Sequence, residues 1–244
     1  MLKNRDIVKN EKLNRENKIM QNKLIKKKEF VKMLRDGMTI MTGGYASCGI
    51  PDALLEAVEK TGVRELTIIS NDCAYAKRGV SRLLENGQIS KMITTHIGRN
   101  PLAGELYGKG QLALELVPQG TLAERIRADG AGLGGVLTPV GVGTEVEEGK
   151  EKIMVRGKEY LLELPLHADL ALIRAAQADT FGNLVYEGTT INFNPLMAMA
   201  ADLVVADVGS ICEIGSFVPE QVGTPGIFVD YVLQGYPMDY VWER

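Results

Sequence analysis

The sequence of 244 residues predicts an α/β fold, in which a mainly parallel sheet is flanked by helices and accompanied by one antiparallel hairpin. Along most of the chain, short apolar, β-prone runs alternate with segments of helical character, which is typical of a parallel sheet covered on both faces. Residues 152–164 instead alternate around Arg156-Gly157, which predicts the hairpin. Hydrophobic residues make up 45% of the chain and charged residues 24%, so a mostly disordered protein is excluded.

The first 28 residues differ from the rest in charge. They hold ten Lys and Arg against three acidic residues, a net charge of +7, whereas the remainder carries −10. Their apolar residues are sparse and form no run suited to a secretory signal or a membrane span. We therefore expect residues 1–28 to be a flexible basic extension and residues 29–244 to form one domain. A polyanion- or membrane-surface-binding arm and a translation start at Met20 are the alternatives.

The elements of the body follow from apolar runs and turn signals. Pro51 and Asp52 mark a helix start, and Thr121 with Glu124 matches a capping box. The glycine-rich stretch 130–149 has neither a helical nor a strand period, so it predicts a long ordered loop, a kind that is often functional. The expected strands are 38–42, 65–70, 92–96, 112–117, 170–174, 184–186 and 203–206, the expected helices 27–35, 51–60, 121–128 and 195–201, and 228–233 is a closing strand or helix.

The strongest local feature is the glycine loop at residues 43–49, between the first strand and the next helix. A glycine loop at a helix N-terminus presents backbone N–H groups that suit a phosphate, and glycine lets a ligand approach the backbone. The spacing matches neither a Walker A loop nor G-x-G-x-x-G, and Ser47 misses the hydrolase nucleophile elbow by one position. A tight strand-to-helix turn is the alternative interpretation.

Candidate catalytic side chains are scarce. Neither His96 nor His167 has a neighbouring serine, cysteine or carboxylate that suggests a catalytic triad. The three cysteines form no C-x-x-C, so we expect no disulfide framework, no metal site and a reducing, cytoplasmic setting. Asn71-Asp72 ends the second strand, where a dinucleotide enzyme places its ribose-binding acid, so an NAD(P)-dependent oxidoreductase stays open. Otherwise the chain binds without catalysing, or another chain supplies the reactive residue.

Several motifs together resemble one known family. The run from Asp36 to Pro51 is similar to the first signature of family I CoA-transferases, with Tyr45 where that family usually has Phe. The resemblance is to the alpha (A) subunit of acetate/butyrate–acetoacetate (3-oxoacid) CoA-transferases, and it extends from about residue 27 to about residue 233. The further matching motifs are SND at 70–72, HIGRNP at 96–101, PQGTLAERIRA at 118–128, GAGLGGVLTPVGVGT at 130–144 and NFNP at 192–195.

The resemblance implies a fold and a reaction. The fold would be the CoA-transferase (NagB/RpiA-like) α/β fold. The reaction would be a ping-pong transfer of CoA from a short-chain acyl-CoA to a carboxylic acid, through a glutamyl-CoA thioester whose glutamate lies on a beta subunit. It follows that no catalytic residue is expected in this chain and that the assembly is a heteromer, α2β2 or larger. Coenzyme A would be substrate and covalent intermediate rather than a permanently bound cofactor, and neither nucleic acid nor a membrane would be a partner.

The resemblance also implies site residues. Asn71 and the amide of Gln119 would face the acyl group, where hydrogen-bond donors stabilise developing oxyanions. Asp72 lies beside them, although a carboxylate next to an anionic substrate is unfavourable unless it is paired. A non-catalytic ligand-binding protein of related fold is the remaining alternative, and the basic extension lacks the helix-turn-helix that its transcription-regulator form would need. The implied CoA-binding residues are Gly43, Gly44, Tyr45, Ala46, Ser47, Cys48 and Gly49.

Overall fold

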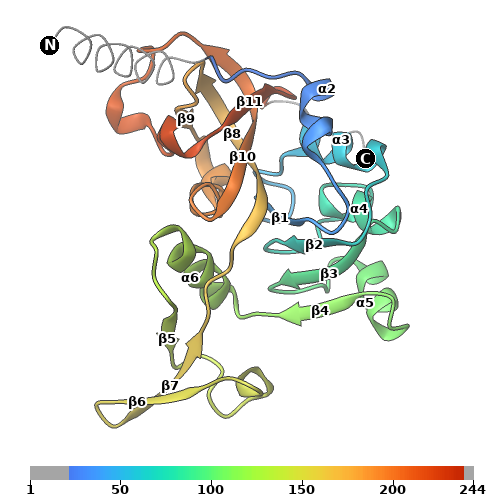
Figure 1. The fold of residues 1–244 in the computed structure, drawn as a ribbon, viewed down its shortest axis with the longest axis vertical. Helices are drawn as coiled ribbons and strands as arrows, with labels where there is room; N and C mark the ends of the chain where they lie inside the picture. Colours follow the sequence, from blue (N-terminus) through green and yellow to red (C-terminus); the bar gives the residue numbers. More distant parts are fainter. Residues whose placement is uncertain (1–21, 239–244) are drawn as a thin grey trace, which may run out of the picture.

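The computed structural model describes residues 22–238, and Figure 1 shows a large twisted sheet with helices on both faces and a small sheet that projects from it. The large sheet has the strand order β11-β10-β8-β1-β2-β3-β4, and each neighbouring pair along this order is parallel. The predicted parallel sheet is therefore confirmed. Its strands are β1 (Thr39–Thr42), β2 (Leu66–Ile69), β3 (Ile89–Thr94), β4 (Ala113–Leu116), β8 (Ala168–Asp179), β10 (Ala201–Cys212) and β11 (Tyr231–Gln234), with β9 (Leu184–Val185) antiparallel on β8.

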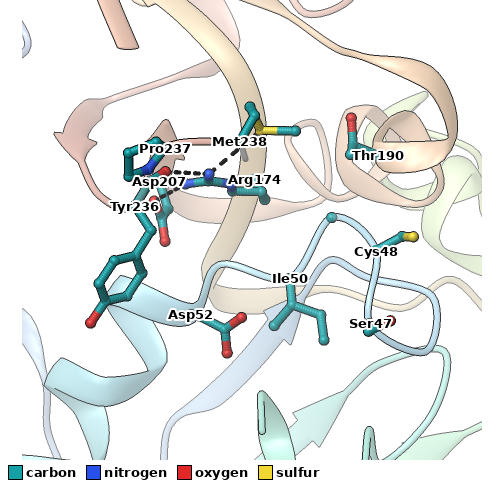
Figure 2. Close-up of a pocket in the computed structure, with 11 residues that line it drawn as sticks. Ser47, Cys48, Ile50, Asp52, Arg174, Thr190, Asp207, Tyr236, Pro237 and Met238 are labelled. Carbon is teal, nitrogen blue, oxygen red and sulfur yellow. Dashed lines mark hydrogen bonds and ion pairs between the residues drawn. The ribbon is translucent and has the colours of Figure 1, made fainter. Parts of the chain in front are cut away.

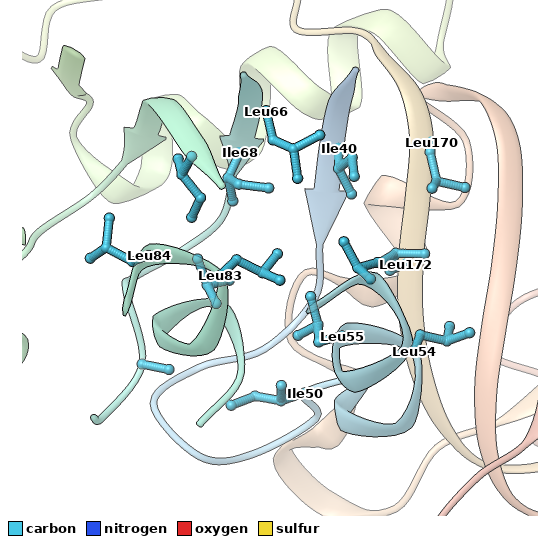
Figure 3. Close-up of a cluster of buried hydrophobic side chains, with 14 of the residues drawn as sticks. Ile40, Ile50, Leu54, Leu55, Leu66, Ile68, Leu83, Leu84, Leu170 and Leu172 are labelled. Atoms are coloured by element: carbon cyan, nitrogen blue, oxygen red, sulfur yellow. The ribbon is translucent and has the colours of Figure 1, made fainter. Parts of the chain in front are cut away.

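Adjacent residues of a strand face opposite sides of the sheet, and apolar residues on each side pack against helices. Ile40 packs with the cluster that includes α3 and α4, whereas its neighbour Met41 packs with the cluster that includes α6 and α7. Figure 3 shows the first cluster, in which Leu54, Leu55 and Leu83 come from helices that lie beside the strand that carries Ile40. The helices are α2 (Lys27–Phe30), α3 (Asp52–Thr61), α4 (Val80–Glu85), α5 (Pro101–Gly108), α6 (Gln119–Gly130) and α7 (Asn194–Met197), and the 3-10 turns are η1 (Val31–Met33), η2 (Glu145–Glu147), η3 (Gly188–Ile191), η4 (Pro219–Gln221) and η5 (Gly226–Phe228).

The neighbouring strands β8 and β10 are much longer than predicted. Because the prediction followed apolar runs, it ended the first of these strands at Arg174 and the second before Asp207. These two residues are paired in the strand register and form a buried ion pair, so the strands continue through them. A buried charge is tolerated within a sheet when its partner lies on the next strand.

The small sheet has the order β5-β7-β6 and is antiparallel. Strands β6 (Lys152–Val155) and β7 (Lys158–Glu163) form the predicted hairpin, and both turn residues between them have positive φ. The prediction that 130–149 is wholly a loop was wrong, because β5 (Val136–Thr138) pairs with β7 and η2 follows it. A strand of three residues is too short to show a period.

Three helix starts differ from the predictions. Helix α6 begins at Gln119 after Pro118, so Thr121 lies inside the helix and the predicted capping box is wrong. The Thr121 hydroxyl is buried and has no hydrogen-bond partner among the described residues. Helices α4 and α5 were not predicted, although Pro101 at the first turn of α5 is a start signal.

The described part of the basic extension belongs to the fold. Lys23 accepts a backbone hydrogen bond from Val232, and Ile25 donates one back to the same residue, so this segment runs beside β11. This pairing gives residues 22–28 partners that composition does not reveal. Residues 1–21 lie outside the described residues.

Within 22–238, no helix combines the length and the apolar character that crossing a membrane requires.

Candidate functional site

The predicted site residues gather at the carboxyl ends of four neighbouring parallel strands. The glycine loop 43–49 follows β1, residues 70–72 follow β2, the segment 95–100 follows β3, and Gln119 comes shortly after β4. In open α/β sheets, ligands bind outside these strand ends. The arrangement therefore places the candidate residues where a substrate site is expected.

The glycine loop is braced by two asparagines that were not singled out from the sequence. Asn192 Oδ1 accepts a hydrogen bond from the Gly44 N–H at 3.0 Å, and Asn192 Nδ2 donates to the Cys48 carbonyl at 3.2 Å. Asn194 Nδ2 donates to the Gly49 carbonyl at 3.2 Å, while its Oδ1 accepts from the backbone of β8. Both asparagines lie in the NFNP motif, which the resemblance matched without a role. The loop is held in one shape from a segment nearly 150 residues later.

The expected phosphate cradle at the start of α3 is not open. The Ala53 N–H donates to Asp207 Oδ2 at 2.9 Å, so a carboxylate from β10 already occupies the N-terminus of the helix. Within the loop, Tyr45 and Cys48 exchange backbone hydrogen bonds of 2.9 Å. The loop therefore meets solvent mainly through side chains, since Tyr45, Ser47 and Cys48 are exposed.

Asp72 is buried, and its carboxylate binds groups of this chain. Its Oδ2 accepts hydrogen bonds from the Ala46 N–H at 2.8 Å and from Asn71 Nδ2 at 2.7 Å. Its Oδ1 accepts from the Ala74 N–H at 2.8 Å. Ala46 and Ala74 both have positive φ, so the carboxylate holds two unusual turns together. The pairing that the sequence left in question is thus supplied by backbone and amide donors.

Asn71 and Gln119 are in direct contact. Gln119 Nε2 donates to Asn71 Oδ1 at 2.6 Å, although the residues come from the ends of different strands. Asn71 is completely buried, whereas Gln119 is exposed. Of the two amides, Gln119 is the one that a ligand can reach.

An arginine and two tyrosines surround the open side of the loop. The Arg99 guanidinium lies 5.7 Å from the ring centre of Tyr45 and 5.8 Å from that of Tyr75, which is within cation–π range. All three side chains are exposed, and no carboxylate of residues 22–238 pairs with Arg99. The sequence matched Arg99 only as part of HIGRNP. It gives this side of the loop an uncompensated positive charge.

A cavity of about 190 Å³ lies behind the loop, and Figure 2 shows its lining. Arg174 crosses it, bonded to Asp207 Oδ1 and to the Tyr236 carbonyl. Burial raises the pKa of Asp207 to about 6, and it also raises the pKa of Asp52 above its usual value. Because Asp207 neutralises the arginine, the described residues that line this cavity offer no free positive charge to an anion.

The histidines and cysteines form no cluster that could hold a metal ion within the described residues. His96 contacts the Thr95 hydroxyl at 3.0 Å. His167 contacts Asp129 at 2.7 Å and Asp202 at 3.2 Å, and these contacts raise its pKa, chiefly through the hydrogen bond to Asp129. Neither ring is hydrogen-bonded to a serine or a cysteine among the described residues.

Sequence comparison places the chain among known enzymes. Residues 25–235 match the family model described as Coenzyme A transferase. The chain is 49% identical over 214 residues to the alpha subunit of acetate CoA-transferase from Escherichia coli K12, with 88% of this chain and 97% of the relative covered. It is 46% identical to the "Acetoacetyl-CoA:acetate/butyrate CoA transferase alpha subunit" of Clostridium acetobutylicum, with 88% and 99% covered. The corresponding subunit of a probable succinyl-CoA:3-ketoacid coenzyme A transferase of Bacillus subtilis is 45% identical, with 85% and 87% covered.

Solved structures agree on the fold. An acyl-CoA transferase apoenzyme from E. coli O157:H7 superposes with a TM-score of 0.76 at 24% identity over 86% of this chain, which spans about half of that longer chain (46%). Glutaconate coenzyme A-transferase from Acidaminococcus fermentans gives a TM-score of 0.77 at 19% identity, with 88% of this chain and 76% of that chain covered. At these identities the likeness concerns the architecture alone.

Proposed function

Because this chain belongs to the coenzyme A transferase family, we propose that it is the alpha subunit of a heteromeric CoA-transferase that moves CoA between a short-chain acyl-CoA and a carboxylic acid. The observation that carries the proposal is similarity over nearly the whole length of two relatives named as alpha subunits. Those names specify acetate, butyrate and acetoacetyl-CoA, so acids of this type are the proposed substrates.

The partner is a beta subunit, and the assembly is α2β2. A glutamate on the beta chain attacks the acyl-CoA carbonyl, and the released CoA thiolate then attacks the mixed anhydride to give a glutamyl-CoA thioester and the first acid. The second acid takes CoA by the reverse steps. Coenzyme A is thus substrate and covalent intermediate, with no permanently bound cofactor, and the compartment is the cytoplasm. Within residues 22–238, the side-chain contacts of the two histidines go to Thr95, Asp129 and Asp202, and the proposal assigns the reactive carboxylate to the other chain.

This chain contributes binding and charge stabilisation. Gln119 presents an accessible amide above the buried Asn71, in a position to donate to the oxyanion that forms at each acyl transfer. Tyr45, Ser47 and Cys48 give the loop an exposed surface for CoA, and Arg99 adds a positive charge that suits a polyanionic substrate. In this proposal, these exposed side chains bind CoA in place of the N-terminus of α3, which the sequence suggested as the phosphate site.

An NAD(P)-dependent oxidoreductase fits this site less well. Such an enzyme would use the acid after β2 to bind a ribose hydroxyl. Here that acid is Asp72, which is buried and accepts three hydrogen bonds from its own chain. A ribose would have to displace them.

The proposal is tested by expressing the chain alone and together with a CoA-transferase beta subunit from the same organism. We expect CoA transfer from acetoacetyl-CoA to acetate or butyrate only when both are present, and tandem mass spectrometry of the trapped intermediate should find the thioester on a beta-subunit glutamate. Robust transfer by the chain alone would contradict the two-subunit account. Tight NADH binding in a fluorescence titration would favour the oxidoreductase.

A further inference from the structure

A continuous line of hydrogen bonds joins Asp72 to the exposed amide of Gln119. Asp72 Oδ2 accepts from Asn71 Nδ2 at 2.7 Å, and Asn71 Oδ1 accepts from Gln119 Nε2 at 2.6 Å. Asn71 is 0% exposed and Asp72 is 7% exposed, so water cannot readily replace either link.

The direction of this line is fixed by chemistry. An ionised carboxylate only accepts hydrogen bonds, whereas an amide group both donates and accepts. Asn71 must therefore turn its NH2 group toward Asp72, which leaves its oxygen for Gln119. Gln119 must in turn present its own NH2 group at this contact, and the second N–H of that group remains for a ligand.

We infer that Asp72 is a positioning residue, whose carboxylate orients the amides of Asn71 and Gln119 so that Gln119 offers an N–H rather than an oxygen to the reacting acyl group. This inference rests on the proposed function, because it concerns how Gln119 acts in CoA transfer. An amide oxygen in the same place would repel the developing oxyanion, so the orientation decides whether Gln119 stabilises it or opposes it.

The same carboxylate sets the position of the glycine loop. Asp72 Oδ2 accepts hydrogen bonds from both the Ala46 N–H of the glycine loop and the side-chain amide of Asn71. The same carboxylate therefore fixes the position of the glycine loop, which is proposed to bind CoA, relative to the Gln119 amide, which is proposed to face the acyl carbonyl.

The chain offers a matched control. Asp179 is also buried, and it accepts two backbone N–H groups, from Phe181 and Asn183, and one asparagine amide, from Asn183. It is the last residue of β8, before the turn that leads to β9, and its hydrogen bonds do not lead to Gln119. Replacing it removes the same kinds of hydrogen bond and tests for a loss of stability alone.

The experiment uses the reconstituted pair of subunits with acetyl-CoA and butyrate, and compares Asp72→Ala, Gln119→Ala, the double variant and Asp179→Ala. Gln119→Ala should lower kcat by roughly 10²–10³-fold, as for other oxyanion donors. Asp72→Ala should lower kcat at least tenfold, and the kcat of the double variant should equal that of Gln119→Ala to within a factor of about two. The loss of the hydrogen bond to the Ala46 N–H should appear separately, as a higher KM for acetyl-CoA in both variants that lack Asp72. Asp179→Ala should lower the melting temperature comparably and leave kcat within a factor of about two. The inference would be overturned if the double variant showed the product of the two single losses in kcat. It would also be overturned if the kcat of Asp72→Ala were within twofold of wild type.

Two further measurements keep the test decisive. If Asp72→Ala does not fold, Asn71→Ala breaks the line at its middle and leaves the backbone bonds of Asp72 intact, and it should show the same non-additivity with Gln119→Ala; multiplying effects would again count against the inference. The side-chain NH2 signals of Gln119 in ¹⁵N-labelled complex need no turnover. The chemical shifts of these signals should move toward those of a free amide in Asn71→Ala and Asp72→Ala but not in Asp179→Ala. Unchanged shifts in the first two variants would refute the orienting role of Asp72.

If the wild-type alpha and beta subunits together transfer no CoA, the proposed function fails. The NH2 signals of Gln119 then still decide whether Asp72 orients its amide.

Discussion

Gly43 and Asn194 are so close that no other residue fits at position 43. A β-carbon on residue 43 would lie 1.7 Å from Asn194 Oδ1, well inside van der Waals contact. That oxygen cannot move away freely, because it accepts a hydrogen bond from the Arg174 N–H of β8 at 2.9 Å. The first glycine of the loop is thus required by close packing of the loop on the NFNP segment.

Gly43→Ala should displace the loop and abolish most CoA transfer, with a loss of stability of the order of 1–3 kcal/mol that overpacking typically causes. Thermal unfolding and kcat/KM of the reconstituted pair check this. Gly104→Ala is the control, since a β-carbon there has nothing within 4 Å and alanine favours the helix α5. Equal behaviour of the two variants would show that the loop tolerates a shift at residue 43.

Arg99→Gln should lower kcat/KM for acyl-CoA several-fold and weaken its dependence on ionic strength. The guanidinium has no carboxylate partner within 22–238, so its charge is available to a polyanionic substrate. Initial rates at low and high salt measure the effect. Arg156→Gln removes the same charge from the exposed hairpin turn and should change neither quantity. Identical rates for the two variants would remove Arg99 from the site.

Arg174→Met should destabilise the protein by roughly 3–5 kcal/mol, because it leaves the Asp207 carboxylate buried without its partner. Burial already raises the pKa of Asp207 to about 6, so the folded state holds that proton more tightly and stability falls as the pH rises through about 6. The loss in Arg174→Met should accordingly be larger at pH 8 than at pH 5 in denaturant titrations.

Adding Asp207→Asn to Arg174→Met should recover part of this stability, since the amide oxygen can still accept from the Ala53 N–H without a charge. A double variant that is less stable than Arg174→Met would mean that the ion pair is not the source of the loss.

His167→Gln should lower the melting temperature at acidic pH and have little effect at alkaline pH. The His167 ring contacts Asp129 and Asp202, and both carboxylates raise the pKa of the histidine. Asp169 also lies near the ring and is paired with Arg35. A raised histidine pKa contributes stability that is complete below the unfolded value near 6.5 and is lost as the pH rises through the folded value. The pairs are solvent-exposed, so the effect is at most about 1 kcal/mol.

Melting curves from pH 5 to 9 measure this difference, with His96→Gln as the control because its ring contacts a hydroxyl rather than a carboxylate. A difference between wild type and His167→Gln that grows with pH would contradict the assignment.

Local patterns in the sequence were enough to locate the parallel strands, the hairpin and the glycine loop. Each depends on a period or a turn residue within a few positions, such as the positive φ of Gly157 between β6 and β7. The family resemblance added Asn71 and Gln119, whose side chains are 2.6 Å apart in the structure. That they face the acyl group stays a prediction.

The remaining features depend on contacts between distant segments. Asn192 and Gly44 are 148 positions apart, and Asp207 and Ala53 are 154 apart. No local pattern indicates which amide or carboxylate will meet which backbone group, so the bracing of the loop and the occupied start of α3 could not be predicted. The same holds for the length of β8, since Arg174 looks like a strand end until Asp207 is known to lie beside it.

The position of β1 between β2 and β8 has a consequence for the order of folding. During synthesis, β1, its loop and α3 leave the ribosome more than 100 residues before β8 and β10, which complete one side of them. Because contacts between distant segments form late, the nascent amino-terminal half exposes an unfinished sheet edge until β8 arrives. A fragment that ends before residue 168 should therefore aggregate rather than fold, and a ribosome pause or a chaperone that shields this edge would govern the yield of the protein.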